Sequence, residues 1–395
     1  EILSEIDYFE RVEFTGDLRR FSESTPILEL IIATKNIETV QDVIKKMPLV
    51  KEVEVVDANS VEVSLSAGFN ARFHFCEPQQ FAKQWLLTTG SKNHLEKILS
   101  KADKKGIFLA LNSEYEPASE EQIYSDLGLA FLPPQLREDS GEVEFAEKGQ
   151  VPKVIKLKDY RADLHMHTNY SDGSNTIEEL AKVALERGYT HFAITDHSQS
   201  LKIASGLSYQ DLKRQKKEIE DVANRLGIPI LRGIECDILS DGTLDFDDNV
   251  LAEMDIVIAS IHRGFKQDEE TLTKRIINSI KNPHVDIIAH PTGRLICQRD
   301  GYKVDLKRII QAAADYGKVL EINSSPLRLD LNDTYARIAA DKGVKIAINS
   351  DAHSVQELEN VFFGVNYAKR AWLQPTNVIN TWSYQELMDF LNRKS

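Results

Sequence analysis

Hydrophobic and polar positions follow two different periods along the first hundred residues. Residues 61–65 and 71–75 alternate with a period of two on either side of a short turn that contains Gly and Asn, which predicts a β-hairpin. An apolar run at 27–33 predicts a further strand, and helical periodicity at 39–47 and 81–105 predicts helices. This part of the chain is therefore expected to be of the α+β class.

After residue 160, short apolar strands alternate with amphipathic helices. The predicted strands are 162–165, 192–195, 229–234, 256–260, 285–289, 319–322 and 345–349. The predicted helices are 176–187, 209–226, 268–281, 304–315 and 332–341, followed by a final helical stretch. Strands that alternate with helices pair in parallel, and seven such units are typical of a closed or nearly closed barrel. The expected fold class is therefore a multidomain α/β protein with a (β/α)7 barrel in its second part.

The composition narrows the classes of function. Residues 1–150 contain 16 Lys and Arg against 27 Asp and Glu, a net charge of -11, and the remainder contains 32 against 35. An acidic half disfavours a phosphate backbone, so any nucleic-acid contact must depend on local patches. No apolar run approaches the ~20 residues of a membrane span. Three cysteines without close pairing favour a reducing, cytoplasmic location.

Residues of metal-binding types gather at the ends of the predicted strands. They are His165, His167 and Asp172 after the first strand, His197 after the second, Glu235 at the third, His262 after the fourth, His290 after the fifth, and Asp351 and His353 after the seventh. In a β/α barrel the carboxyl ends of the strands converge on the active site. Six of the ten histidines lie there, so we interpret the set as a metal centre rather than as unrelated helix caps and core histidines.

Nine ligands exceed the needs of one ion. Imidazole and carboxylate groups without thiolates suit Zn, Mn or Fe. Ions held ~3.5–4 Å apart share a water, lower its pKa and clamp the leaving oxygen of a phosphoester. A carboxylate is needed to bridge such ions, and Glu235, which stands in mid-barrel, is the candidate. The set therefore predicts a polynuclear, metal-dependent phosphoesterase.

The motifs around these ligands resemble those of the polymerase-and-histidinol-phosphatase (PHP) domain. They are Leu164-His165-Met166-His167-Thr168, Thr195-Asp196-His197, Gly233-Ile234-Glu235, Ser260-Ile261-His262, His290-Pro291-Thr292-Gly293-Arg294 and Ser350-Asp351-Ala352-His353. The resemblance covers residues 161–395 and implies a distorted seven-stranded barrel with three divalent ions. It also implies three ligand sets: His165, His167, Glu235 and Asp351; Glu235, His262 and His290; and Asp172, His197 and His353.

The first part of the chain resembles the palm and thumb of bacterial family X DNA polymerases, which carry a PHP domain after the thumb. The similar stretches are Gly16-Asp17-Leu18-Arg19-Arg20, Thr89-Gly90-Ser91-Lys92-Asn93-His94, 124–128 and 133–138. The resemblance implies a nucleotidyltransferase-like palm at 1–85, a thumb-like region at 86–140, a linker at 141–160 and the PHP barrel at 161–395. A chain that begins without Met is then expected to be a fragment that lacks the family's N-terminal helical region.

The palm departs from the family pattern at the positions that bind triphosphate and metal. Asp17 stands where the family has Ser, and an anion there repels the triphosphate. A two-metal polymerase centre needs three carboxylates, whereas Ile27, Glu29 and Arg72 align with those positions. We therefore expect no DNA polymerase activity.

Substrate and catalytic roles extend to further side chains near the predicted barrel mouth. The cations expected to hold the substrate phosphate are Lys202, Arg263, Arg294 and Arg328, and the competing interpretation is a solvated or ion-paired surface. The residues expected in catalysis are Glu235, His262 and Asp351, the last two as alternatives for assisting the leaving oxygen.

Three functions compete on these grounds. The intact ligand set favours a 3′–5′ exonuclease that processes DNA 3′ ends in repair. The acidic palm favours a small-molecule phosphomonoesterase similar to histidinol phosphatase. A scaffold with structural metals is the third, and a complete ligand set with phosphate-binding Arg disfavours it. The expected partner is thus a DNA 3′ end or a small phosphoester, without a membrane and with no obligate protein partner evident.

Overall fold

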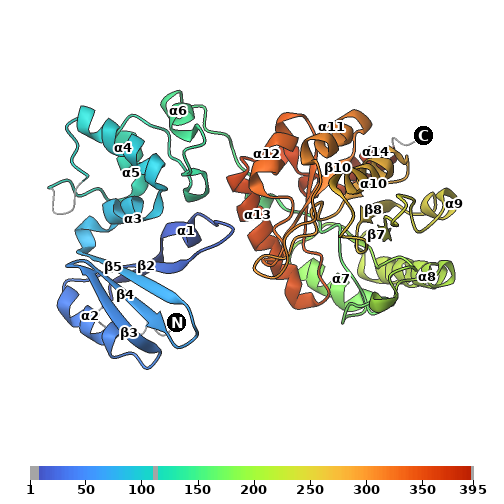
Figure 1. Cartoon of the computed structure of the whole chain (residues 1–395), viewed down its shortest axis with the longest axis horizontal. Coiled ribbons are helices and arrows are strands. Elements are labelled where there is room, and N and C mark those ends of the chain that lie inside the picture. The colour runs from blue at the N-terminus through green and yellow to red at the C-terminus, as the bar shows by residue number, and fades with distance from the viewer. Residues whose placement is uncertain (1–8, 110–113, 393–395) are drawn as a thin grey trace. The chain divides into compact units, whose positions relative to one another are not determined.

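Two compact units, residues 1–153 and 154–395, make up the chain (Figure 1). The computed structural model describes residues 9–109 and 114–392. Each unit has its own β-sheet and its own hydrophobic core, which is the property of separate domains.

The first unit contains a five-stranded sheet in the order β1-β2-β5-β4-β3. Its strands are β1 (Arg11–Phe14), β2 (Ile27–Ala33), β3 (Val50–Asp57), β4 (Ser60–Leu65) and β5 (Asn70–Cys76). β2 and β5 are parallel, and the other neighbouring strands are antiparallel. β4 and β5 form the predicted hairpin, and Gly68 in its turn has a φ of +88°, which glycine adopts without strain.

Helices cover both faces of this sheet because β2 is apolar on both sides. Leu30 and Ile32 belong to a cluster with Val40 and Ile44 of α2 (Ile37–Lys45). The alternate positions of β2 belong to another cluster with Phe81, the first residue of α3 (Phe81–Thr89). The period of two along the strand thus decides which helix each side chain contacts.

The rest of the first unit is helical. Its helices are α1 (Gly16–Arg19), α4 (Lys92–Lys104), α5 (Glu120–Asp126) and α6 (Glu142–Glu147). The fully buried Arg137 forms an ion pair of 2.6 Å with Glu120, which ties the helical part together. Residues 142–147 lie in the expected linker, yet they form α6, which contacts α4 and has Val143 and Ala146 buried.

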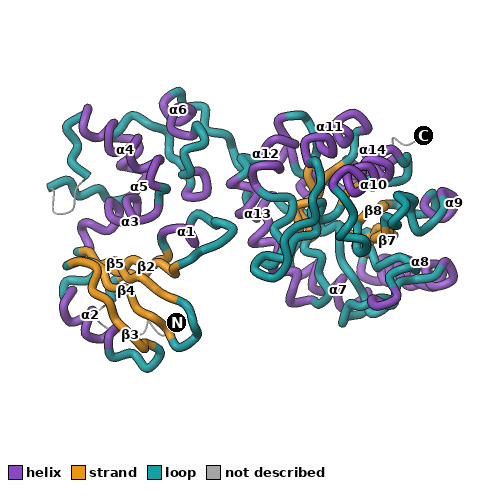
Figure 2. Tube along the Cα trace, viewed as in Figure 1, coloured by secondary structure: helices purple, strands orange, loops and turns teal. Residues whose placement is uncertain are grey.

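The second unit contains a curled sheet of six parallel strands in the order β11-β10-β9-β8-β7-β6. They are β6 (Phe192–Ile194), β7 (Ile230–Asp237), β8 (Ile256–Ser260), β9 (Ile287–Ile288), β10 (Val319–Asn323) and β11 (Ile346–Asn349). The helices lie outside these strands (Figure 2). They are α7 (Ile177–Glu186), α8 (Tyr209–Leu226), α9 (Asp248–Leu251), α10 (Glu269–Lys281), α11 (Leu306–Tyr316), α12 (Asp333–Asp341), α13 (Val361–Arg370) and α14 (Tyr384–Leu391). The expected β/α alternation is confirmed.

The first of the seven predicted strands, residues 162–165, is wrong as a strand. Residues 162–165 have no regular ladder, and the segment makes one isolated bridge, Met166 with Ala352. It nevertheless binds both edges of the sheet, because Ala193 and Thr195 donate backbone hydrogen bonds to Asp163 and Met166, and Asp351 donates one to His165. The segment therefore closes the six-stranded sheet into a distorted barrel.

Side-chain oxygens explain why no strand forms there. The amides of Leu164 and Met166 donate to Oδ1 of Asn349 and to Oγ1 of Thr195, at 3.3 and 3.0 Å. The fully buried Asp163 accepts from the amides of His165 and Ser350 at 3.3 and 3.2 Å. Backbone donors that would form a ladder are thus satisfied by side chains, and the segment can bend around the residues predicted as metal ligands.

The barrel interior is apolar at one end and polar at the other. Inward positions near the strand starts, such as Leu231, Ile256 and Val319, share a cluster with Leu387 and Leu391 of α14. Continuing along a strand in steps of two leads from Leu231 to Glu235, and from Ile258 to His262. The same alternation therefore builds a hydrophobic base closed by α14 and brings the polar side chains together at the carboxyl ends.

Candidate metal centre

All nine residues predicted as metal ligands lie together at the carboxyl ends of the barrel strands. Each has a carboxylate oxygen or imidazole nitrogen within 4.0 Å of a partner in the set. Glu235 comes from β7 itself, and the others come from the segments that follow strand ends or from the closing segment. The nine come from six separate segments, so the cluster exists only in the folded barrel.

Glu235 is the centre of the cluster. The carboxylate is 1% exposed and faces five imidazoles. The distances to Oε2 are 3.5 Å from His165 Nε2, 3.6 Å from His167 Nε2 and 2.7 Å from His197 Nδ1. The distances to Oε1 are 3.3 Å from His262 Nε2 and 3.1 Å from His290 Nε2. A single carboxylate thus has one group of histidines at each oxygen, which suits a ligand that bridges two cations.

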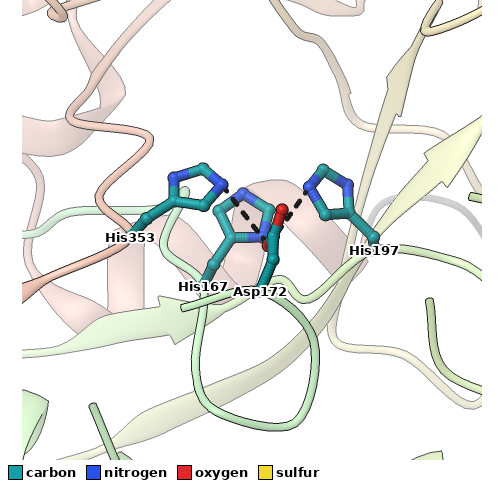
Figure 3. Close-up of side chains that lie close together, drawn as sticks. All are labelled: His167, Asp172, His197 and His353. Atoms are coloured by element: carbon teal, nitrogen blue, oxygen red, sulfur yellow. Dashed lines mark ion pairs between the residues drawn. The ribbon is translucent and has the colours of Figure 1, made fainter. Parts of the chain in front are cut away.

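Asp172 is the centre of a second group (Figure 3), in which the Asp172 and His353 side chains are more exposed than the Glu235 carboxylate. Its Oδ1 atom lies 3.5 Å from His197 Nε2, 3.4 Å from His353 Nε2 and 4.0 Å from His167 Nδ1. The His167 ring stacks on the rings of His197 and His353, each at 4.3 Å between centroids. These four side chains come from three different segments and can surround one ion.

Asp351 links the two groups. Its Oδ1 atom is 3.0 Å from His167 Nε2 and 3.4 Å from His165 Nε2. His197 also reaches both groups, because Nδ1 faces Glu235 and Nε2 faces Asp172. The resemblance implies His197 only in the set with Asp172, whereas the structure places it between two sets.

Buried atoms without hydrogen bonds test whether these residues fit metal ions. Among the described residues, the buried side-chain atoms that lack a hydrogen-bond partner include His165 Nε2, His167 Nδ1, His197 Nδ1 and Glu235 Oε2. Unpaired buried polar atoms are costly and are expected to have a partner. All four belong to the cluster and are of types that bind divalent cations. The set therefore fits a divalent-metal site.

The charges in the site depend on one another. Burial alone would raise the pKa of Glu235, but the imidazoles of His262, His197 and His165 outweigh burial and hold that pKa well below its ordinary value. Burial alone would lower the pKa of His262, whereas the carboxylates of Glu235 and Asp237 raise it to about 9. The carboxylates thus remain charged, and protons compete with metal ions for the imidazole nitrogens.

Two buried carboxylates that the sequence analysis did not single out hold the histidines in place. Glu321 accepts from His165 Nδ1 at 2.8 Å and from the backbone amide of His290 at 2.8 Å. Asp237 lies 2.6 Å from Nδ1 of His262. Both belong to the inward series of their strands, two residues beyond Val319 and Glu235 respectively, and that register was the signal that could have identified them.

Cations near the site differ in what they contact. Arg328 is half-buried, and its Nε lies 3.7 Å from Asp351 Oδ2. Asn323 donates to the same Oδ2 atom at 2.9 Å. Arg294 instead donates to the backbone carbonyls of Arg328, at 2.8 Å, and Leu329. Arg328 therefore faces the predicted metal ligands, whereas the Arg294 guanidinium holds the loop that carries Arg328.

The other two predicted phosphate ligands lie on other loops at the carboxyl ends of the strands. Lys202 is exposed in the 3-10 helix Lys202–Ala204. Arg263 is exposed and donates from Nη2 to the backbone carbonyl of Ser200. Neither has an ion pair with a described carboxylate that draws it away from solvent. The structure therefore places both near the mouth, on the loops that follow β6 and β8.

The palm positions of the first unit lie on β2 and β5. Glu29 is opposite Arg72 in the parallel pair. Its Oε2 atom lies 2.9 Å from His74 Nε2, and Arg72 Nη2 lies 2.7 Å from Glu62 Oε2. Asp17 pairs with Arg20. The one carboxylate left at the aligned positions is thus engaged by a histidine, and the neighbouring strand presents a cation.

Comparisons with known proteins match both units. The PHP domain family matches residues 163–325. The DNA polymerase/3′-5′ exonuclease PolX of Bacillus subtilis (strain 168) is 40% identical over 407 residues, which is 100% of this chain and 70% of that protein. A probable phosphatase of Thermoanaerobacter sp. (strain X514) is 34% identical over 244 residues, 59% of this chain and 94% of that protein.

A solved structure also matches part of this chain. Histidinol phosphate phosphatase from Lactococcus lactis, solved with zinc, L-histidinol and phosphate, is 16% identical, has a TM-score of 0.40, and covers 54% of this chain and 95% of its own. In the described part of the chain, no helix has the length and apolar character needed to cross a membrane. The match to the Bacillus subtilis protein runs through both units, so the chain belongs to the family of the DNA polymerase/3′-5′ exonuclease PolX, and residues 163–325 belong to a PHP domain.

Proposed function

We propose that this chain is a metal-dependent 3′–5′ exonuclease that processes DNA 3′ ends, and that its polymerase centre has been lost. The observation that carries the proposal is the Glu235 carboxylate surrounded by five imidazoles at the open end of the barrel. Phosphoester hydrolysis follows from this site and from the family. The choice of DNA is supported by the relative that spans the whole chain, whose name includes 3′-5′ exonuclease.

Three divalent ions, of Mn, Zn or Fe, are the proposed cofactors. One ion would be held by His165, His167, Glu235 and Asp351, and a second by Glu235, His262 and His290. The third would be held by Asp172, His197 and His353, and His197 also lies close to Glu235. Such ions lower the pKa of water and stabilise charge on a transferred phosphoryl group. Five of these nine side chains are fully or almost fully buried, which fixes their positions before substrate binds.

The chain's own residues orient the substrate. Arg328 points to Asp351 from the rim and is the proposed ligand of the reacting phosphate, because guanidinium binds phosphate oxygens in pairs. Asn323 fixes the orientation of Asp351 through a hydrogen bond to the same Oδ2 atom. Glu235, His262 and Asp351 remain the proposed residues beside the reacting phosphoryl group. Lys202, Arg263 and Arg294 contribute positive potential around the mouth.

Loss of the polymerase centre rests on the first unit. The aligned positions hold Ile27, Glu29 and Arg72, and Glu29 is paired with His74. One engaged carboxylate beside a cation is a poor site for two Mg²⁺ ions, which need several oxygen ligands. We keep the palm at 1–85, the thumb at 86–140 and the barrel at 161–395 as proposed domains. The chain would then retain polymerase architecture without nucleotidyl transfer.

A small-molecule phosphomonoesterase is the second candidate. It is favoured by a relative named as a probable phosphatase whose match covers 59% of this chain and 94% of that relative. It is also favoured by the acidic first unit, with a net charge of -11 over residues 1–150. The same site would then act on a monoester, and the first unit would play no part in substrate binding.

The experiment is hydrolysis of a 5′-labelled single-stranded oligonucleotide with Mn, beside a panel of small phosphomonoesters. His165→Ala removes a ligand from the buried cluster, and His284→Ala, which lies outside the cluster on the turn after α10, is the matched control. Stepwise shortening that only His165→Ala abolishes supports the exonuclease. Turnover of a monoester with an intact oligonucleotide would replace it by the phosphatase.

A further inference from the structure

Three loops at the barrel mouth are joined into one rim. Ile296, after β9, donates its backbone amide to Leu327, after β10, at 2.6 Å. Phe265, after β8, stacks on Tyr302, with ring centroids 5.6 Å apart and planes 12° from parallel. The loops that follow β8, β9 and β10 therefore form a continuous, fixed surface beside the metal-binding residues.

Arg299 is an exposed cation on this rim. Its guanidinium lies over the Phe265 ring, 4.6 Å from the centroid, and Nη2 donates to the backbone carbonyl of Gly293 at 2.7 Å. In the described part of the chain, no carboxylate lies within ion-pair distance of Arg299. The ring and the carbonyl fix the direction of the guanidinium, and its remaining N–H groups are left for a ligand.

The Arg328 cation acts on Arg299. Loss of water around Arg299 and the Arg328 cation both lower the pKa of Arg299. The Arg328 side chain has one ion pair among the described residues, the 3.7 Å contact with Asp351. The repulsion between two fixed arginines is offset when an anion lies between or beside them.

We propose that Arg299 binds the phosphate next to the one that is hydrolysed, and so makes the site selective for a nucleotide chain over a small phosphoester. The inference rests on the proposed function. Arg328 reaches Asp351 of the metal-binding set, so it serves the reacting phosphate, whereas Arg299 lies on the adjoining loop and has no contact with that set. A ligand with one phosphate at the metal-binding set and a second beside Arg299 must carry at least two phosphate groups.

The test compares binding and turnover in the full chain. Binding uses a short, labelled single-stranded oligothymidylate with phosphorothioate linkages, measured by fluorescence anisotropy at several salt concentrations. Turnover uses bis(p-nitrophenyl) phosphate, which has a single phosphate. Arg299→Ala is expected to weaken oligonucleotide binding about tenfold, with a smaller change in KM for the single phosphate. The slope of log affinity against log salt should fall by about 0.7, as for one lost phosphate contact on a single strand.

Three further variants separate charge from loop structure. Arg299→Lys keeps the charge and should retain most of the affinity, whereas Arg299→Gln keeps a donor for the Gly293 carbonyl and should bind as weakly as Arg299→Ala. Arg308→Ala removes an equal charge from α11, where Arg308 pairs with Glu270, and should leave both readouts unchanged. A glutamine variant that binds as the wild type would overturn the proposal.

The two proposals fail in different ways. A wild-type protein that binds the oligonucleotide through Arg299 but does not shorten its cleavable counterpart would overturn the exonuclease and leave the phosphate site standing. A wild-type protein that shortens the oligonucleotide with the same affinity in all Arg299 variants would overturn the site alone.

Discussion

Nδ1 of His165 lies 2.8 Å from Oε1 of Glu321, and Oε2 of the same carboxylate accepts the backbone amide of His290 at 2.8 Å. One fully buried side chain on β10 therefore fixes two of the predicted metal ligands, which come from different segments. A carboxylate on the far nitrogen of a metal-binding histidine sets the tautomer and the ring orientation, and strengthens the nitrogen that faces the metal. Glu321 is thus a positioning residue of the centre.

Replacing Glu321 should weaken metal binding without removing a ligand. Glu321→Gln is expected to lower the affinity for Mn or Zn about 10- to 100-fold, the range found when a hydrogen-bond partner of a metal ligand is replaced. The reason is that a neutral amide accepts a weaker hydrogen bond from His165 than the charged carboxylate does. Isothermal titration calorimetry of the metal-free protein measures this affinity. Glu359→Gln, on the surface beside Arg187, is the control and should bind as the wild type. Equal affinities for the two variants would contradict the role of Glu321.

Replacing Gly173 should affect only the ion bound by the group around Asp172. An added Cβ would lie 2.4 Å from the backbone oxygen of His167 and 2.8 Å from the amide of Thr168. Gly173→Ala must therefore push the loop away and move Asp172. We expect one ion to bind about tenfold more weakly or to be lost, while the sites around Glu235 stay filled, as measured by metal content after dialysis.

The control for Gly173 lies next to it. Ser174 is exposed, so Ser174→Ala should retain the full metal content. Loss of all ions in Gly173→Ala would mean that the loop supports the whole centre, and an unchanged content would mean that the loop adapts.

The nine clustered residues could be predicted because strand ends in a β/α barrel converge whatever the details of the sheet. Glu321 was missed because it stands inside an apolar strand, where only the inward register from Val319 reveals it. The segment 162–165 was predicted as a strand because its apolar pattern is that of one. The amides there bind Asn349 and Thr195, which are distant in sequence, so no local pattern could indicate the distortion.

In the first unit, exposure limited the prediction. β3 has exposed side chains at seven of its eight positions, so no buried face produces a recognisable alternation. Arg294, in the second unit, illustrates a different limit. Its type suits a phosphate ligand, but only the folded loop shows that its guanidinium binds the carbonyls of Arg328 and Leu329.

Nucleotide incorporation should be absent in the full chain. Glu29 is paired with His74, and Arg72 with Glu62, so the aligned palm positions lack free carboxylates for two Mg²⁺ ions. Extension of a primed template with Mg²⁺ and deoxynucleotides should give no product longer than the primer. His165→Ala is included so that hydrolysis cannot hide synthesis. Extension by that variant would show that the palm still holds its metals.

The stability of the first unit should depend on a carboxylate in its helical part. Glu120 accepts two hydrogen bonds from Arg19, at 2.9 and 2.6 Å, and two from Arg137, at 2.6 and 3.1 Å. Burial alone would raise its pKa, but the Arg137 cation and the hydrogen bonds from both arginines outweigh burial and lower it to about 2. The charged form is therefore favoured by folding.

Acid should remove this stabilisation. A pKa of about 2 in the folded state against an ordinary 4.5 corresponds to roughly 3 kcal/mol. That contribution is present above pH 4.5 and is lost as the pH falls from 4.5 towards 2. Glu120→Gln should lower the free energy of unfolding by a similar amount at pH 7, and the difference from the wild type should shrink below pH 4.5. Urea unfolding followed through Trp85, with Trp372 and Trp382 replaced by Phe in both proteins, reports on the first unit. A difference that stays constant from pH 7 to pH 3 would mean that the charge of Glu120 does not stabilise the fold.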